Sequence, residues 1–348
     1  MSRLSHNAIL AKTHAMYGKR ITKEQYDAMM KCHSVSEVAG FLKTQTHFKT
    51  ALANIAESNI HRGQLENLLH RAVFEDYSKL YRYLFSKQET FSRYVIEEEE
   101  IREILRMVLL MKADNAKSFI LDLPGYLISR SSVDLMAVAH SNNFEELIHV
   151  LENTPYSSIL KRFRPTEDRP FINYVGCEHA FYEYFFRHMT EDIKKSYKGL
   201  EQKRLLDLLN LRIELLNLSH IMRSKTYLNT SNSDIVRSLF PYYYKLTSKD
   251  LMKMIEAKDS ETLNQLFYQT PYCRQFSSEE FPYVEDYTNR VQYRSCRRAL
   301  HFSTHSSVAF YSYIVLSQLE LSNVINIIEG IRYQISESEM RKLIVFSD

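Results

Sequence analysis

The sequence predicts an all-α fold, and three observations carry this prediction. Glycine and proline are scarce, with 7 of each among 348 residues, whereas turn-rich β folds and glycine-looped α/β folds use many of both. Apolar residues recur at spacings of three and four, for example along residues 66–86, which is typical of helices with one buried face. The chain is also long enough for roughly two or three domains with cores of their own.

Three segments of the chain resemble one another, and we call them the hairpin segments. They span Ile21–Phe48, Ile128–Tyr156 and Leu246–Tyr272. Each opens with an aliphatic and then a hydroxyl residue, has a polar break in its middle, and reaches a closing Thr-x-aromatic 25, 26 or 24 positions after its opening. This pattern predicts two helices joined by a short turn.

Signals for helix ends support this interpretation of the hairpin segments. Ser, Thr and Asn are favoured N-cap residues, because the side-chain oxygen accepts a hydrogen bond from a free N–H of the first helical turn. The closing Thr-Pro-Tyr predicts a helix end, because proline disfavours α geometry in the residue before it. The predicted caps of the first helices are Thr22, Ser129 and Thr247, and those of the second helices include Ser34 with Glu37 and Asn142 with Glu145.

A second element recurs in the same order, as a helix containing a glutamate. Aligning Glu103, Glu214 and Glu320 places these helices 82, 86 and 74 positions after the openings of the hairpin segments. The residues three positions after the glutamates are Arg106, Asn217 and Asn323. Side chains at this spacing lie on one helix face, so they are potential partners of the glutamates.

The two recurring elements predict an internal triplication, with helical units at 1–115, 116–230 and 231–348. A fragment at Ile335–Met340 resembles the start of a further hairpin segment, and Phe163–Pro170 predicts a loop inside the second unit. Known solenoid repeats have shorter periods of about 20–50 residues. Three helical domains, either strung out or closed about a pseudo-threefold axis, fit the longer period better.

The charge and the cysteine content of the chain argue against several classes of protein. The net charge of +3 is spread along the chain, which does not predict nucleic-acid binding. The four cysteines lie far apart, which predicts reduced thiols and neither disulfides nor a zinc site. The most apolar run, Val308–Leu316, has nine residues, whereas a spanning helix needs about 20. We therefore expect no membrane-spanning segment.

Motifs for catalysis or cofactor binding are missing. No glycine-rich phosphate loop occurs, and neither the His301–His305 pair nor the single Glu146-x-x-His149 motif makes a persuasive metal site. We expect the run Glu97–Glu100 to be a solvated acidic helix start. The cluster Arg290, Arg294, Arg297 and Arg298 favours a solvated helix flank over a docking face. We predict no catalytic, cofactor-binding or metal-binding residue and no cofactor.

The chain resembles the C subunit of V-type (archaeal and bacterial A/V-type) ATPases, which is related to the eukaryotic d subunit. The resemblance rests on YGKRITKEQYDAMMKCHSVSEVAGFLKTQTHF, on the Thr-Pro-Tyr endings, and on LELSNVINIIEGIRYQISESEMRKLIV. It covers essentially the whole chain. These motifs are structural and not catalytic. The second hairpin segment departs from the pattern, with Ser132 in the place of Gln25, and Phe163–Pro170 is a candidate local insertion.

The resemblance implies three similar helical domains about a pseudo-threefold axis, forming a funnel. It implies a non-enzymatic rotor subunit on the cytoplasmic side of the membrane. Its partners would be the central-stalk subunits D and F and the membrane rotor ring, and it would transmit torque between ATPase head and ring without spanning the bilayer. The alternative is a soluble helical-repeat scaffold for other proteins, and an all-α metal or isoprenoid enzyme is disfavoured by the missing motifs.

Overall fold

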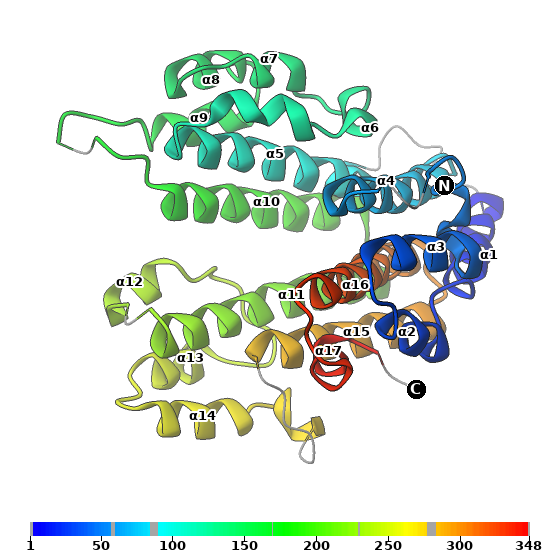
Figure 1. Cartoon of the computed structure of the whole chain (residues 1–348). Helices are drawn as coiled ribbons and strands as arrows, with labels where there is room; N and C mark the ends of the chain where they lie inside the picture. Colours follow the sequence, from blue (N-terminus) through cyan, green and yellow to red (C-terminus); the bar gives the residue numbers. More distant parts are fainter. Residues whose placement is uncertain are drawn as a thin grey trace. The chain divides into compact units, whose positions relative to one another are not determined.

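The computed structural model describes residues 3–56, 60–83, 90–168, 170–228, 230–276 and 283–346. These ranges form α-helices, short 3-10 helices and their connections, and contain no β-strand, which confirms the all-α prediction (Figure 1). The chain divides into two compact units. We call Met1–Ser86 with Lys198–Asp348 the larger unit and Lys87–Tyr197 the smaller unit.

The larger unit is built around α16 (Ser306–Arg332), which packs against most of the other helices of this unit. In Figure 1 the red α16 lies beside the blue helices from the other end of the chain. The remaining elements are α1 (Arg3–Tyr17), α2 (Lys23–Met30), α3 (Val35–Gln45), η1 (His47–Thr50), α4 (Arg62–Tyr81), α11 (Gly199–Thr226), α12 (Asn232–Arg237), α13 (Ser248–Ile255), α14 (Ser260–Tyr268), η5 (Cys273–Phe276), α15 (Val284–Phe302) and α17 (Glu337–Leu343).

The smaller unit has two longer helices, α5 (Tyr94–Lys112) and α10 (Tyr174–Ser196), which pack against each other. Its shorter elements are η3 (Thr90–Arg93), η4 (Ala116–Asp122), α6 (Gly125–Ile128), α7 (Leu135–Ala139), α8 (Phe144–Val150) and α9 (Pro155–Lys161). The predicted loop at 163–170 is non-helical at each described position, and residue 169 lies outside the described residues.

Local sequence explains where most of the hairpin helices begin. Thr22 and Thr247 cap α2 and α13, and each forms a capping box with the residue three positions later. Ser34 caps α3 by accepting a hydrogen bond from the N–H of Glu37. Asp259 caps α14 in the same way. The first and third hairpin segments therefore fold as the predicted pairs of helices.

The second hairpin segment begins later than predicted. Ser129 lies at the end of α6, so its assignment as an N-cap was wrong. The cap is Asp134, whose side chain accepts a hydrogen bond from the N–H of Ala137 at the start of α7. The second helix of this pair, α8, is capped by Asn143, one position after the predicted Asn142. The preceding residues are held in place by a carboxylate of α5, as described below.

The core of the larger unit joins the two ends of the chain. Residues of α2 and α3, such as Met29 and Leu42, are buried in one cluster with Val324 and Ile327 of α16. Burial of large aliphatic side chains is the main favourable term in folding, at about 1.5–3 kcal/mol for each fully buried side chain. A second cluster lies among α11, α13, α14 and α15.

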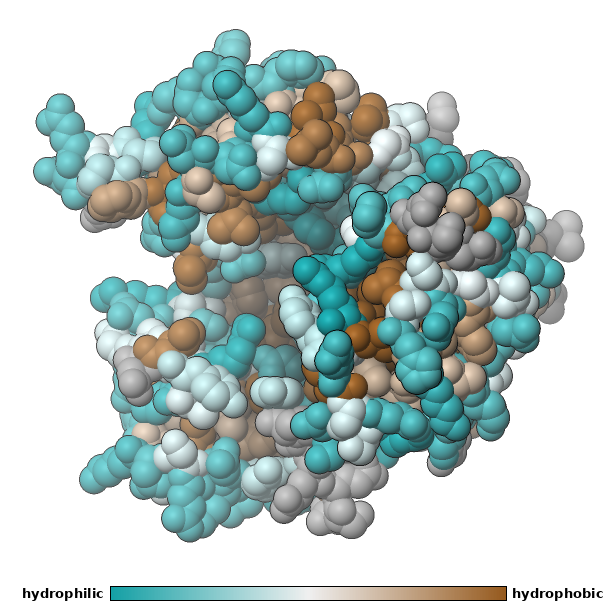
Figure 2. Space-filling model, in the orientation of Figure 1, coloured by the Kyte–Doolittle hydropathy of each residue, from teal (hydrophilic) through white to brown (hydrophobic). Residues whose placement is uncertain are grey.

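Helix α16 is long and apolar enough to cross a membrane by length and composition, although the sequence analysis found only a nine-residue apolar run. An apolar 18-residue stretch of this helix is 61% buried inside the chain. Every residue of the helix from Ser306 to Leu316 is buried. This burial is typical of a central core helix. The face shown in Figure 2 is mostly hydrophilic, with smaller hydrophobic patches.

Candidate functional site

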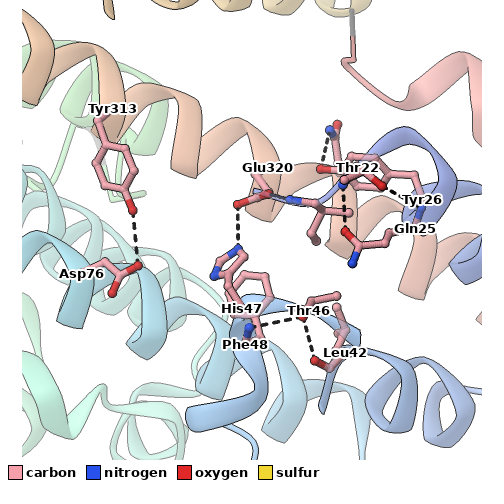
Figure 3. A network of polar contacts seen from close by, with 12 residues as sticks. Thr22, Gln25, Tyr26, Leu42, Thr46, His47, Phe48, Asp76, Tyr313 and Glu320 are labelled. Carbon is pink, nitrogen blue, oxygen red and sulfur yellow. Dashed lines mark hydrogen bonds and ion pairs between the residues drawn. The ribbon is translucent and has the colours of Figure 1, made fainter. Parts of the chain in front are cut away.

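A polar centre in the larger unit is the carboxylate of Glu320 on α16. The backbone N–H of Ile21 donates to Oε1 of Glu320 over 2.6 Å, and Nε2 of His47 lies 3.0 Å from Oε2. Figure 3 shows the His47 and Glu320 side chains pointing toward each other from the turn after α3 and from α16. The side chains of His47 and Glu320 are 21% and 14% exposed, so solvent screens this pair only partly.

The turn after α3 places His47 at this carboxylate. The hydroxyl of Thr46 donates to the carbonyl of Leu42 over 2.7 Å and accepts from the N–H of Phe48 over 3.2 Å (Figure 3). One side chain thereby satisfies the end of α3 and the start of η1, which fixes the direction in which His47 leaves the turn. Helix α3 therefore ends directly before the closing motif of this segment, although the motif has no proline here.

The pKa of His47 reflects two opposed effects. Burial lowers the pKa, but the hydrogen bond and negative charge of Glu320 outweigh it, so the pKa of His47 is raised above its ordinary value. Asp76 raises it further and Lys19 opposes this. The imidazole is thereby favoured in its charged form, in which it donates to the carboxylate.

Glu214 on α11 has a similar position relative to the third hairpin segment. Its side chain is completely buried. The backbone N–H groups of Tyr244, Lys245 and Leu246 donate to it over 2.8, 3.0 and 3.1 Å. The hydroxyl of Tyr272, in the closing motif of the segment, also donates to it. One carboxylate therefore fixes both ends of the third hairpin segment.

In the smaller unit, Glu100 on α5 makes the equivalent contacts with the second hairpin segment. The backbone N–H of Ser132 donates to Oε1 of Glu100 over 2.5 Å, and the hydroxyls of Ser131 and Ser132 donate to it over 2.9 and 3.0 Å. The closing Tyr156 donates its hydroxyl to Oε2 over 2.8 Å. We call Glu100, Glu214 and Glu320 the clamp glutamates.

The first hairpin segment differs from the others in the group that reaches its clamp glutamate. Phe48 occupies the position of Tyr156 and Tyr272 in the closing motif and has no hydroxyl. The preceding residue, His47, supplies the hydrogen bond instead. The three closing motifs therefore deliver one donor each, but only the first delivers a group that titrates near neutral pH.

Two of the clamp glutamates are followed, one helical turn later, by an asparagine that forms hydrogen bonds with the backbone of another chain segment. Asn217 donates to the carbonyl of Phe240 over 2.9 Å and accepts from its N–H over 3.0 Å. Asn323 makes the same pair of bonds with Val345, at 2.9 and 2.8 Å. Backbone N–H and C=O groups outside a helix lack the hydrogen-bond partners that a helix provides. Here one side-chain amide bonds both the N–H and the C=O of a single residue and so supplies those partners.

The clamp in the smaller unit corrects the predicted alignment of the glutamates. The sequence comparison placed Glu103 with Glu214 and Glu320, but the hairpin contacts belong to Glu100, one turn earlier. Glu103 instead pairs with Arg106 over 2.6 Å, and Arg106 donates to the carbonyl of Phe119 over 3.2 Å. Glu103 therefore occupies the position of the two asparagines and not that of the clamp.

The acidic run at Glu97–Glu100 is not the solvated helix start that we expected. Glu98 and Glu100 are buried. Glu97 lies 2.8 Å from Nδ1 of His188 on α10, and Glu99 pairs with Arg102 over 2.7 Å. Glu97 and Glu99 are partly buried, and the whole run is largely withdrawn from solvent because α5 packs against α10, η4 and α7.

Two arginines of the cluster on α15 also make contacts within the chain. Arg290 donates to the carbonyls of Ile344 and Lys342, over 2.9 and 3.2 Å. The guanidinium of Arg294 lies 4.1 Å from the ring centroid of Phe276, a cation–π contact. A solvated flank was therefore wrong for these two residues, whereas Arg298 is exposed.

The histidines considered as metal ligands have other neighbours. His301 lies against the ring of Tyr17, and His305 lies 3.7 Å from Glu201. Glu146 accepts from the N–H of Asn142 at the start of α8. Across the described ranges no group of three or more His, Cys, Asp or Glu side chains could hold a metal ion. The polar centres of this chain bind its own backbone, which is a structural role.

Comparison with known proteins finds a family match over most of the chain and relatives that match part of it. The ATP synthase (C/AC39) subunit family matches residues 9–343. The C subunit of the A-type ATP synthase of Thermococcus kodakarensis is 23% identical over 216 residues, which cover 62% of this chain and 56% of that protein. The protein of the same name from Desulfurococcus sp. is 22% identical over the same length. The matched stretch therefore spans just over half the length of these curated relatives. On the family match, the chain belongs to the ATP synthase (C/AC39) subunit family.

Proposed function

We propose that this chain is a non-catalytic rotor subunit of a V-type ATPase or ATP synthase. It links the central stalk, made of subunits D and F, to the membrane rotor ring and transmits torque between them. The family match over residues 9–343 carries this proposal, and relatives named as the C subunit of A-type ATP synthases support it. The buried polar centres add physical support, because they join chain segments and are not arranged for a reaction.

We further propose that the chain contains three related helical units, near 1–115, 116–230 and 231–348, with helices shared between them. The three clamp glutamates support this, because each accepts hydrogen bonds from residues near the start of one hairpin segment and from its closing motif. In the proposed assembly the units surround a pseudo-threefold axis and form a funnel that receives the stalk.

A subunit that transmits torque needs rigid connections between its chain segments. A buried carboxylate with several donors makes a rigid connection, because each lost donor weakens the stabilisation of a charge in a region of low dielectric constant. Glu214, with three backbone N–H donors and a tyrosine hydroxyl, accepts four hydrogen bonds. Glu100 also accepts four, from one backbone N–H and three hydroxyls. The clamps would transmit load from the hairpin segments to the long helices.

The proposed place of the chain is the cytoplasmic side of the membrane, within the ATPase complex and in contact with the bilayer only through the ring. The burial of α16 among the other helices of the larger unit supports a peripheral arrangement. The small net charge of +3 supports protein partners over nucleic acid.

Affinity purification from gently solubilised membranes of the source cells tests this proposal. The tagged chain is expected to recover the ATPase head, the stalk subunits and the ring together. Recovery of soluble partners alone, under conditions in which a tagged head subunit recovers the ring, would contradict the rotor role. That outcome would favour the helical-scaffold alternative.

A further inference from the structure

A groove of about 500 Å³ lies in the larger unit between α11 and α15. The start of α16 and the connection before α13 complete its walls. Its floor is apolar, since Leu208, Leu211 and Val308 are buried beneath it. Two aromatic residues stand at its rim, Phe302 with 77% and Tyr244 with 38% of the residue exposed. Large aromatic side chains exposed beside an apolar floor are typical of binding surfaces.

The charges around the groove are mainly positive. Arg204, Lys245 and Arg298 line it, against one carboxylate, Asp207. Among the residues that the structure describes, neither Arg204 nor Arg298 has an ion-pair partner. Lys245 lies over the rings of its neighbours Tyr244 and Tyr272 and also has no carboxylate partner in these ranges. The groove therefore presents cations that the chain itself does not neutralise.

A second pocket in the same unit is also lined by arginines, but these have partners within the chain. It measures about 460 Å³ and is lined by Arg290, Arg294 and Arg341. Arg341 pairs with Asp27 over 2.6 Å, Arg290 binds two backbone carbonyls, and Arg294 lies on an aromatic ring. These cations are committed to internal contacts, whereas those of the groove between α11 and α15 are available to a partner.

We propose that the groove between α11 and α15 is the docking site for an acidic, amphipathic helix of the central stalk. The inference rests on the proposed function. A helix places apolar side chains three and four positions apart on one face, which matches an apolar floor in a groove between two helices. Carboxylates flanking that face would meet Arg204 and Arg298, so charge complementarity selects the partner. Phe302 and Tyr244 would enclose the apolar contact and exclude water.

Direct titration tests this assignment. The full-length chain is titrated with the purified complex of stalk subunits D and F, and the dissociation constant is measured at two salt concentrations. The double variant R204E/R298E is expected to weaken binding by about tenfold or more, and the salt dependence of binding is expected to flatten. The variant F302A, which removes a rim aromatic, is expected to weaken binding by about fivefold or more.

Lys203 provides a matched control. It is exposed, neighbours Arg204 on α11 and does not line the groove. The variant K203E changes the charge of α11 by two, as R204E alone does. It is expected to leave the dissociation constant within about twofold, since a charge outside the groove acts mainly through screened fields. R204Q/R298Q provides a second pair without added negative charge, and circular dichroism confirms that each variant is folded.

The outcomes separate the inference from the proposed function. Stalk binding by the unmodified chain that R204E/R298E weakens no more than K203E would overturn the groove assignment and leave the rotor role standing. Absence of any stalk binding by the unmodified chain would overturn both. A preference for a second copy of the chain, seen as a concentration-dependent dimer that F302A abolishes, would also overturn the assignment.

Discussion

Ile21 and Glu320 lie 299 positions apart, yet the backbone N–H of Ile21 donates to the Glu320 carboxylate over 2.6 Å. This bond joins the first hairpin segment to the last long helix. The other two hairpin segments are held by a helix that precedes them, with 32 positions between clamp glutamate and the N–H at Ser132 or Leu246. The first segment thus completes the C-terminal part of the larger unit.

Further contacts hold the same junction. Arg341 of α17 pairs with Asp27 of α2 over 2.6 Å, and Asn323 donates to the hydroxyl of Tyr26 over 3.2 Å. The apolar cluster shared by α2, α3 and α16 lies beneath them. The two ends of the chain are therefore one cooperative region, and the following predictions concern mainly that region.

Glu320→Gln is expected to lower the free energy of unfolding by about 2 kcal/mol, because hydrogen bonds to a charged partner are worth about 1.5–3 kcal/mol. Amide exchange at Ile21 is expected to accelerate in the same variant. Urea unfolding and hydrogen exchange measure the two effects. Unchanged protection of the Ile21 amide would show that the clamp does not hold this segment.

The first clamp is expected to weaken as the pH rises. The pKa of His47 is raised in the folded chain, so charged His47 stabilises the fold below its unfolded pKa of about 6.5, and this contribution is lost as the pH rises through the higher folded value. Between pH 6 and pH 8 the unmodified chain is expected to lose more stability than His47→Gln, as measured by urea unfolding at the two pH values. Equal losses in both chains would contradict the prediction.

Glu214→Gln is expected to be among the most destabilising single changes, at about 3 kcal/mol, because an amide offers one acceptor where four donors converge. Tyr272→Phe removes one donor and is expected to cost about 1.5 kcal/mol. Thermal unfolding followed by circular dichroism compares the two. A larger cost for Tyr272→Phe than for Glu214→Gln would be incompatible with the clamp as described.

Asn323→Ala is expected to cost about 2–3 kcal/mol, because it removes both hydrogen bonds to Val345 from a buried site. Asn326 is a matched control on the same helix, where its side chain donates to the carbonyl of Leu343 over 3.3 Å in a partly buried setting. Asn326→Ala is expected to cost less than about 1 kcal/mol. Similar losses of stability in the two variants would contradict the prediction that the two hydrogen bonds between Asn323 and Val345 make a larger contribution.

Gly330→Ala is expected to destabilise the junction by about 1–3 kcal/mol, since a Cβ there would clash with Sδ and Cγ of buried Met340 on α17. Gly63 on α4 is the control, because a Cβ there meets nothing within 4 Å. Gly63→Ala is expected to be neutral or to stabilise by up to about 0.5 kcal/mol. Denaturant midpoints of the two variants give the comparison.

Sequence reasoning predicted the helical fold and most helix starts because these depend on local signals. Thr22 and Thr247 cap their helices in capping boxes that can be recognised within four residues. The cap at Asp134 was missed because Ser129 offered an equally plausible local signal. What distinguishes them is a long-range contact, the hydrogen bonds from Ser131 and Ser132 to Glu100, which no local pattern encodes.

Only part of the candidate site could be predicted from the sequence. Recurring glutamates were recognised, but the run at Glu97–Glu100 and the nearby Glu103 offered five acidic residues for one clamp. Glu98, Glu100 and Glu103 are all buried, and only the contacts with the second hairpin segment distinguish Glu100. Those contacts depend on how α5 packs against its neighbours. The closing aromatic residues were recognised only as part of a recurring motif, whereas Tyr156 and Tyr272 hold the hairpin segments through hydroxyls that reach the clamp glutamates.

The most direct test of the rotor role is to remove the chain from the working complex. In membrane vesicles from source cells that lack it, ATP-driven ion transport is expected to be abolished while the ATPase head still hydrolyses ATP, and added chain is expected to restore transport. Ion transport that continues at the normal rate without the chain would contradict the proposal that it connects stalk and ring.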